Sequence, residues 1–223
     1  MNDEQEPQPP PPQVIKAVGI PSAEAFGTPT LLKSYPYWQY FLALESDLDA
    51  TTRYVEPARR NFATYSIEFA RILLSAGAEV DVVAQVLCRR IDPTSTAVNI
   101  QLYREKILSA FPRFPTMRVV VPRFALLFEP WRDWERGETP LWWRSHNKVK
   151  HERDAYFQDA SLENAFLAVA GLFCLVLYFY QPALYSNELK PWARLLTLEK
   201  EPGYLMLEQN YELPDFTSTP RGT

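Results

Sequence analysis

The chain has 223 residues, a formal net charge of −4 and a sequence pI of about 5.4. These values exclude a globally basic nucleic-acid-binding protein, so any contact with a polyanion must be made by a local group of cations. Hydrophobic residues make up 47% of the chain and aromatic residues 14%, enough for one domain with a real core. The two cysteines, Cys88 and Cys174, lie far apart in apolar stretches and are predicted to be reduced core residues of a cytoplasmic protein. The acidic N-terminus lacks the basic and apolar regions of a signal peptide.

Three segments are predicted along the chain. Residues 1–33 are expected to be a disordered or irregular N-terminal arm, residues 34–190 a helical domain, and residues 191–223 an irregular C-terminal tail. Four consecutive prolines at positions 9–12 give the arm some polyproline II character. A solvated tail is favoured over a ligand for an SH3-type domain, because no basic anchor flanks the prolines.

Helical periodicity dominates the first half of the domain. Residues 34–48 are rich in aromatic side chains and are predicted to start a helix that packs on the core. A long helix is predicted over 55–90, because apolar residues recur there every three or four positions, and Pro57 suits its first turn. A second helix is predicted to begin near residues 94–96, where hydroxyl groups can cap it, and to end at Pro112.

The second half begins less regularly. Residues 112–140 are predicted to be an irregular insertion, with a short strand at Val119–Val121 as the one candidate for regular structure. A third helix is predicted over 141–154. A fourth is predicted over 160–180, with Ser161 as its N-terminal cap. The succession predicts an all-α fold, a helical bundle with an aromatic-rich insertion.

Four of the six tryptophans gather around the start of the third helix: Trp131, Trp134, Trp142 and Trp143. Such rings could stack on nucleobases. We favour an anchoring role, in which each ring buries a large area and fixes the loop and the helix to the core.

Residues 165–184 form a run of 20 positions without a charged side chain. A run of this length is also typical of a membrane span. A buried central helix is favoured, because Gln181 and Pro182 interrupt the end of the run and the other amphipathic helices need a central partner.

The third helix carries the most informative pattern of polar residues. Seven positions of a helix come to within about 20° of two full turns, so Arg144 and His151 share one face, about 10 Å apart along the axis. Asn147 and Lys148 fall between them on the same side. Two cations, an amide and a side chain that titrates near neutral pH suit a phosphate group better than a carboxylate or a metal.

Two simpler interpretations remain open for this pattern. The charged residues could form an ordinary solvated helix face, and His151 could be held by Asp154, three residues further on. A zinc site is not expected, because His146 and His151 would point about 140° apart on a helix and no further ligand motif accompanies them.

The run from Arg144 to His151 resembles the Arg-x(4–6)-His signature of the HEPN superfamily, at the six-residue spacing. The resemblance covers residues 54–180. It implies an α-helical bundle built on two long helices, with the motif near the last long helix. It also implies a metal-independent endoribonuclease that needs no cofactor, in the manner of HEPN proteins of toxin–antitoxin and phage-defence systems.

The resemblance assigns roles to individual residues. Arg144 would bind the scissile phosphate, His151 would be the general acid/base, and Asn147 or Lys148 would position the backbone. Further nucleic-acid contacts are expected from Lys148, Lys150, Arg153 and His146. The expected partners are RNA, a second copy of the chain that faces the first across a cleft, and a cognate antitoxin protein.

Two other classes of function stay open. HEPN-like domains also serve as non-catalytic dimerisation or interaction modules, and Ser145 stands here where active members often carry Asn, Asp or His. The third class is a helical protein anchored in a membrane through residues 165–184.

Overall fold

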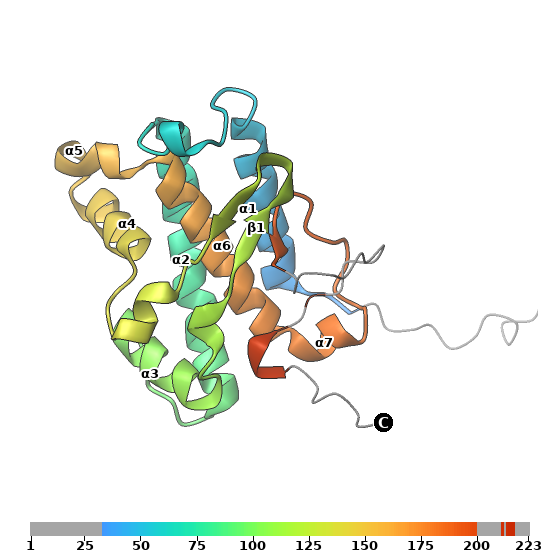
Figure 1. Ribbon diagram of the computed structural model, residues 1–223. Coiled ribbons are helices and arrows are strands. Elements are labelled where there is room, and N and C mark those ends of the chain that lie inside the picture. The colour runs from blue at the N-terminus through green and yellow to red at the C-terminus, as the bar shows by residue number, and fades with distance from the viewer. Residues whose placement is uncertain (1–32, 200–210, 212, 217–223) are drawn as a thin grey trace, which may run out of the picture. The chain divides into compact units, whose positions relative to one another are not determined.

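The computed structural model describes residues 33–199, 211 and 213–216, and helices account for most of them (Figure 1). The helices are α1 (Pro36–Thr51), α2 (Ile67–Ile91), α3 (Ile100–Ala110), α4 (Leu141–His151), α5 (Arg153–Tyr156), α6 (Leu162–Phe179) and α7 (Gln181–Tyr185). The strands are β1 (Val119–Val121), β2 (Leu126–Phe128) and β3 (Thr197–Leu198). They form one small antiparallel sheet in the order β2-β1-β3.

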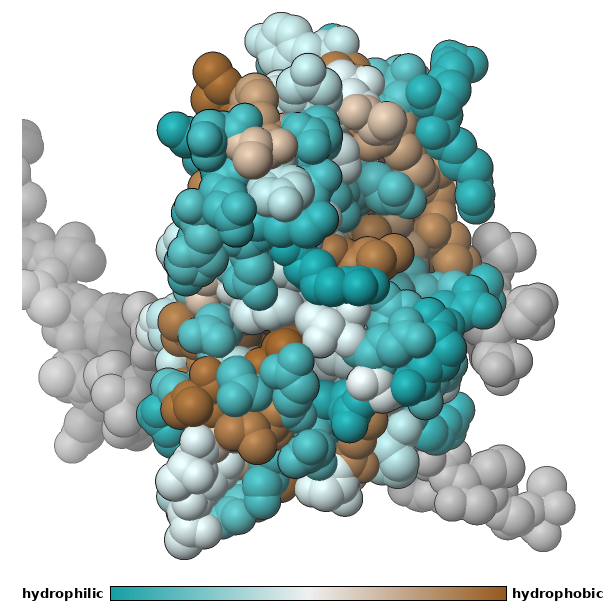
Figure 2. Space-filling model, turned by 90° about the vertical axis from the view of Figure 1, so that its left-hand side faces the viewer, coloured by the Kyte–Doolittle hydropathy of each residue, from teal (hydrophilic) through white to brown (hydrophobic). Residues whose placement is uncertain are grey.

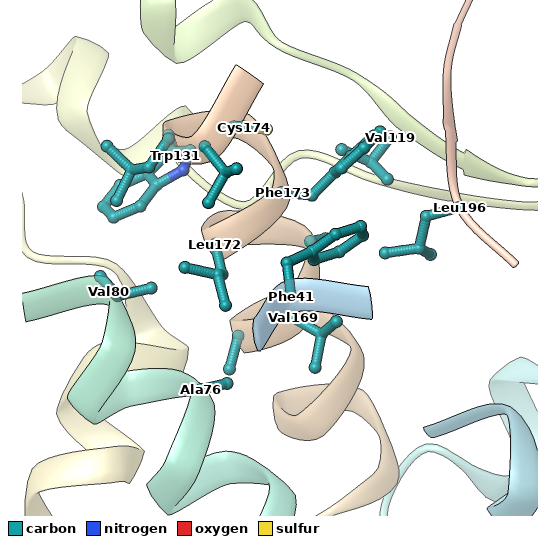
Figure 3. Close-up of a cluster of buried hydrophobic side chains, with 14 of the residues drawn as sticks. Phe41, Ala76, Val80, Val119, Trp131, Val169, Leu172, Phe173, Cys174 and Leu196 are labelled. Carbon is teal, nitrogen blue, oxygen red and sulfur yellow. The ribbon is translucent and has the colours of Figure 1, made fainter. Parts of the chain in front are cut away.

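Helix α6 is the centre of the core. Its sequence is apolar on every side, and α1, α2, α4 and β2 all pack against it. In Figure 3 its side chains point in different directions: Leu172 lies toward Val80 of α2, whereas Phe173 lies toward Phe41 of α1. The rings of Phe41 and Phe173 stack with centroids 5.0 Å apart. An apolar helix is stable at this position because its neighbours cover it all round.

Helices α2 and α6 start side by side and run in the same direction. The N–H of Leu162 donates to the carbonyl of Thr64 over 2.8 Å. Each helix has a serine cap: the Oγ of Ser66 accepts from Phe69 N, and the Oγ of Ser161 accepts from Asn164 N. The central pair of helices is therefore joined at its N-terminal ends by backbone hydrogen bonds.

Helix α4 packs on α2 and α6 through one face (Figure 1). The buried side chains on that face are Trp142, Trp143, His146 and Val149. The indole N–H of Trp142 donates to the carbonyl of Pro130 over 2.8 Å, and that of Trp131 donates to the carbonyl of Gly171 over 3.1 Å. The predicted anchoring role of the tryptophans is confirmed, because all four rings around this helix are buried.

A buried carboxylate holds the segment that leads into β3. Glu45 of α1 is 2% exposed, and its oxygens accept hydrogen bonds from the N–H groups of Arg194, Leu195 and Leu196 over 2.9 to 3.1 Å. Residues 194–196 belong to the predicted C-terminal tail, and this part of it packs on the core. Burial raises the pKa of Glu45, although the three N–H groups act in the opposite direction.

The prediction of a predominantly helical fold is confirmed, and the finer prediction of a HEPN-like bundle stays a prediction. The candidate strand Val119–Val121 is β1, and with β2 and β3 it forms a small sheet that the all-α class omits. Within the described residues, α6 is long and apolar enough to cross a membrane, and 78% of that window is buried inside the protein. The predicted N-terminal arm lies outside the described residues, apart from Lys33.

Several predicted boundaries are corrected. The long helix begins at Ile67 instead of residue 55, because the Ser66 cap starts it there and the preceding residues form turns. The second helix begins at Ile100, where the side chain of Asn99 caps it. The third helix ends at His151, and the residues predicted to complete it begin α5.

Candidate functional site

The predicted site residues divide between two sides of α4. Five of them are exposed on this helix, and a sixth is exposed on α5: Arg144, Asn147, Lys148, Lys150, His151 and Arg153. Hydrophilic residues predominate on the upper part of the face in Figure 2, where α4 and α5 lie. His146 is the exception, because it is only 3% exposed and lies on the face that packs against α2.

Arg144 and His151 both point away from the core. Neither side chain makes a hydrogen bond or an ion pair with the described residues, so His151 is not held by Asp154. Arg144 lines a cleft together with Asn147 and Lys150. His151 lies outside the lining of that cleft, at the C-terminal end of the helix.

The side chain of Lys148 contacts two residues of its own chain. Its ammonium group lies 3.4 Å from the carboxylate of Asp159 and 4.8 Å from the ring centroid of Tyr156. Both partners are on the segment that follows α4. The structure thus separates two lysines that are two positions apart: Lys150 lines the cleft, and Lys148 is engaged within the chain.

The cleft has a volume of about 540 Å³ and lies between α2, the start of α3 and α4. Helix α2 contributes Gly77 and Asp81, and the start of α3 contributes its N-cap Asn99 and Gln101. The side chain of Gln101 donates to the hydroxyl of Thr139 over 3.2 Å. Volumes of 300 to 1,000 Å³ are typical of sites for small ligands.

His146 forms part of the wall of the cleft and is the most perturbed titratable group there. Its Nδ1 is buried and has no hydrogen-bond partner among the described residues. Burial is the main reason why the pKa of His146 is lowered to about 4, and the positive charge of Lys150 acts in the same direction. The imidazole is therefore neutral at pH 7, and it packs against the ring of Trp143 with centroids 5.2 Å apart.

Sequence reasoning missed the residues that α2 and α3 contribute. Asp81 accepts a hydrogen bond from the hydroxyl of Tyr103 over 3.0 Å, and Asn99 caps α3. No motif marks these positions. The burial of His146 did have a signal, because Trp142, His146 and Val149 follow the spacing of one helix face.

In the part of the chain that the structure describes, no three His, Cys, Asp or Glu side chains gather as they would around a metal ion. The arrangement of α4 offers exposed cations, an amide and an imidazole instead. Comparisons with protein-family models, with curated proteins and with solved structures find no match to this chain.

Proposed function

We propose that the protein is a HEPN-like, metal-independent endoribonuclease that cleaves RNA by attack of the ribose 2′-OH. One observation carries the proposal: Arg144 and His151 are exposed on a single helix and have no partner among the described residues. Both side chains are therefore free to contact a phosphate group, as the motif requires. Such a protein would act in a toxin–antitoxin or phage-defence system.

The chemistry divides between the two side chains. The reaction needs the 2′-OH deprotonated, the negative charge of the pentacoordinate phosphorus stabilised, and the leaving 5′-oxygen protonated. Arg144 stabilises the charge, because a guanidinium group binds two phosphate oxygens and stays charged. His151 moves the proton, because an imidazole ring has one nitrogen that can accept a proton and one N–H that can donate one.

Asn147 stands between the two residues on the exposed side of α4 and positions the RNA backbone. Lys150 and Arg153 add local positive charge to an acidic chain. Lys148 is not part of this set, because Asp159 and Tyr156 engage it. His146 is not part of it either, because the ring is buried.

A second copy of the chain would complete the site. Seven residues of helix span about 10 Å, a long reach for two side chains that must act on one phosphate. One histidine must also serve as base and acid in the same turnover. A two-fold dimer brings two arginines and two histidines to one phosphate and meets both needs.

The argument for a dimer is purely chemical. An excess of apolar surface on the fourth helix and the tryptophans would be a second ground for a dimer. The structure removes this ground, because α6 is mostly buried and Trp131, Trp134, Trp142 and Trp143 are at most 6% exposed.

The experiment is an RNA cleavage assay in EDTA with structured and unstructured RNA. We expect products with 2′,3′-cyclic phosphate ends. Arg144→Ala and His151→Ala should each lower the rate by about 100-fold or more, in line with the loss of a general acid/base or a charge-stabilising group. Arg59→Ala removes an exposed arginine from a turn outside the cleft and serves as the matched control.

Cleavage that survives in both α4 variants would reject the assignment. A folded wild-type protein that does not cleave RNA would favour the non-catalytic interaction module, the function that Ser145 after the arginine suggests.

A further inference from the structure

Lys148 is engaged by its own chain at the centre of the Arg144–His151 face. It lies four residues after Arg144 and three before His151, so the three side chains leave the same side of α4. Arg144 and His151 have no partner among the described residues, whereas the ammonium group of Lys148 lies 3.4 Å from a carboxylate oxygen of Asp159. The position between the two motif residues therefore carries a charge that the chain itself neutralises.

A second contact holds the same ammonium group. It lies 4.8 Å from the ring centroid of Tyr156, within the range of a cation–π interaction. Tyr156 is the last residue of α5, and Asp159 is the last residue of the short 3-10 helix Phe157–Asp159 that follows. One segment thus offers Lys148 both a carboxylate and the negative face of an aromatic ring, in place of the negative charge that a phosphate would supply.

The segment that carries Asp159 is fixed to the core. The side-chain amide of Asn164, in α6, donates to the carbonyl of Asp159 over 2.8 Å. The N–H of Ser66, the cap of α2, donates to the carbonyl of Ala160 over 3.4 Å. Asp159 is therefore held in place by the central helices, whereas Lys148 has a long and flexible side chain. The lysine is the partner that can move to another anion.

The ion pair is loose enough to be exchanged. Its N–O distance of 3.4 Å exceeds the about 2.7–2.9 Å that is typical of a strong charge-assisted hydrogen bond. The side chain of Lys148 is 49% exposed and that of Asp159 is 24% exposed, so a ligand can reach the ammonium group. Pairs with this exposure contribute little to stability. A phosphate can displace Asp159, but it must compete with it.

From these contacts we infer that Asp159 is an autoinhibitory counter-ion, which withholds Lys148 from an RNA phosphate bound at Arg144. The inference deepens the proposed function and rests on it for the identity of the ligand. RNA on α4 must replace the carboxylate of Asp159 by a phosphate before Lys148 contributes to binding. The contact lowers the affinity of this face for polyanions, and removal of the Asp159 charge frees Lys148 as a further RNA contact.

The test is a binding measurement that does not involve cleavage. The probe is a fluorescent single-stranded oligoribonucleotide with 2′-O-methyl groups, which lacks the attacking hydroxyl, and the readout is anisotropy in EDTA with full-length protein. Asp159→Asn should lower the Kd about fivefold, because Lys148 no longer has to leave a carboxylate. The slope of log K against log salt should become steeper by about 0.7, the value for one more phosphate contact on a single strand.

Two comparisons separate a released lysine from a change in net charge. Asp154→Asn is the matched control, because it removes an exposed carboxylate of α5 that has no ion pair with the described residues; its Kd should change less than twofold. Lys148→Ala should raise the Kd less than twofold in the wild-type chain and about fivefold in the Asp159→Asn background, a double-mutant cycle that measures the competition.

Three results would overturn the inference. The first is an equal gain in affinity from Asp154→Asn and Asp159→Asn, which would reflect net charge alone. The second is a gain from Asp159→Asn that persists when Lys148 is alanine. The third is weaker RNA binding by Asp159→Asn, the result expected if the ion pair serves only to hold the segment after α4 in place.

Failure of the two proposals can be told apart. Tighter binding by Asp159→Asn that requires Lys148, without cleavage by any variant, would keep the counter-ion and reject the ribonuclease. Cleavage that depends on Arg144 and His151, with no gain in affinity from Asp159→Asn, would keep the ribonuclease and reject the counter-ion. Absence of RNA binding in every variant would reject both.

Discussion

The imidazole of His146 occupies the space that a side chain at Gly77 would need. A Cβ built on Gly77 would lie 2.3 Å from Cδ2 and 2.5 Å from Nε2 of His146. Glycine thus lets α4 approach α2 closely, and this approach places Arg144, Asn147 and Lys150 along the edge of the cleft. A glycine inside α2 and a histidine on α4 together determine how close the two helices can lie.

Gly77→Ala is predicted to destabilise the protein. Alanine is normally better than glycine inside a helix by about 1 kcal/mol. Here the overlap with His146 should outweigh that gain, since overpacking costs about 1–3 kcal/mol. Chemical denaturation of Gly77→Ala, His146→Ala and the double variant measures the interaction free energy between the two positions. In the His146→Ala background the glycine substitution should be neutral or stabilising; an equal loss in both backgrounds would contradict the contact.

The stability of the fold should depend on pH through His146. The pKa of this histidine is about 4 in the folded protein and about 6.5 in an unfolded chain. Below pH 6.5 the unfolded chain therefore takes up a proton that the folded protein does not bind until about pH 4. The free energy of unfolding should fall by about 3 kcal/mol as the pH is lowered from 7 to 4.

Urea denaturation of wild type and His146→Leu across this range isolates the effect. The variant lacks the titrating group, so its stability should fall less steeply with decreasing pH. Parallel curves for the two proteins would show that burial of His146 does not govern the pH dependence.

Glu45→Ala is predicted to loosen the segment that carries β3. The substitution leaves the N–H groups of Arg194, Leu195 and Leu196 without their acceptor, and the expected loss of stability is about 2–4 kcal/mol. Glu45→Gln keeps one oxygen as an acceptor and should cost less. Hydrogen exchange at residues 194–196 is the measurement, and Glu105→Ala on the exposed side of α3 is the control. Unchanged hydrogen exchange at residues 194–196 in Glu45→Ala would show that Glu45 does not hold this segment.

Arg144→Ala and His151→Ala are predicted to leave the thermal midpoint almost unchanged. Both side chains are exposed and have no partner among the described residues, and surface substitutions of this kind usually change stability by less than about 0.5 kcal/mol. Calorimetry of the two variants measures this. A loss of several degrees would instead indicate a structural role in the fold, as expected for a non-catalytic module.

The oligomeric state is open to a direct measurement. The chemical argument for two copies of the motif at one phosphate predicts a homodimer, so light scattering in moderate salt should give about twice the chain mass of 25.8 kDa. A strictly monomeric protein that still cleaves RNA would contradict the shared site.

The elements that the sequence predicts best are those with a strong apolar signal. The sequence predicts a helix over residues 160–180 and α6 spans Leu162–Phe179, because an uninterrupted apolar run can only be buried as a whole. The start of α2 is harder to predict from the sequence. Phe62 and Tyr65 continue its apolar spacing, yet both precede the helix and pack on Phe128 and Phe157. Spacing alone cannot tell a helical residue from one in an adjoining turn.

The site could be predicted only on α4. The exposure of Arg144 and His151 is a property of one helix, and helical geometry gives it directly. The cleft depends on how α4 lies against α2 and α3, and no local pattern predicts that Gly77 and Asp81 would line it together with Lys150. Contacts between distant segments are set by packing of the whole core, which a single helix does not encode.

The side-by-side start of α2 and α6 has a consequence for synthesis on the ribosome. The apolar face of α2 includes Leu73, Val80 and Leu87, and its main partner is a helix that begins only at Leu162. A chain that emerges from its N-terminus must keep this face uncovered until α6 has followed, and such exposed surface is prone to aggregation. Nascent chains that end before α6 are therefore the stage at which a chaperone would be needed most.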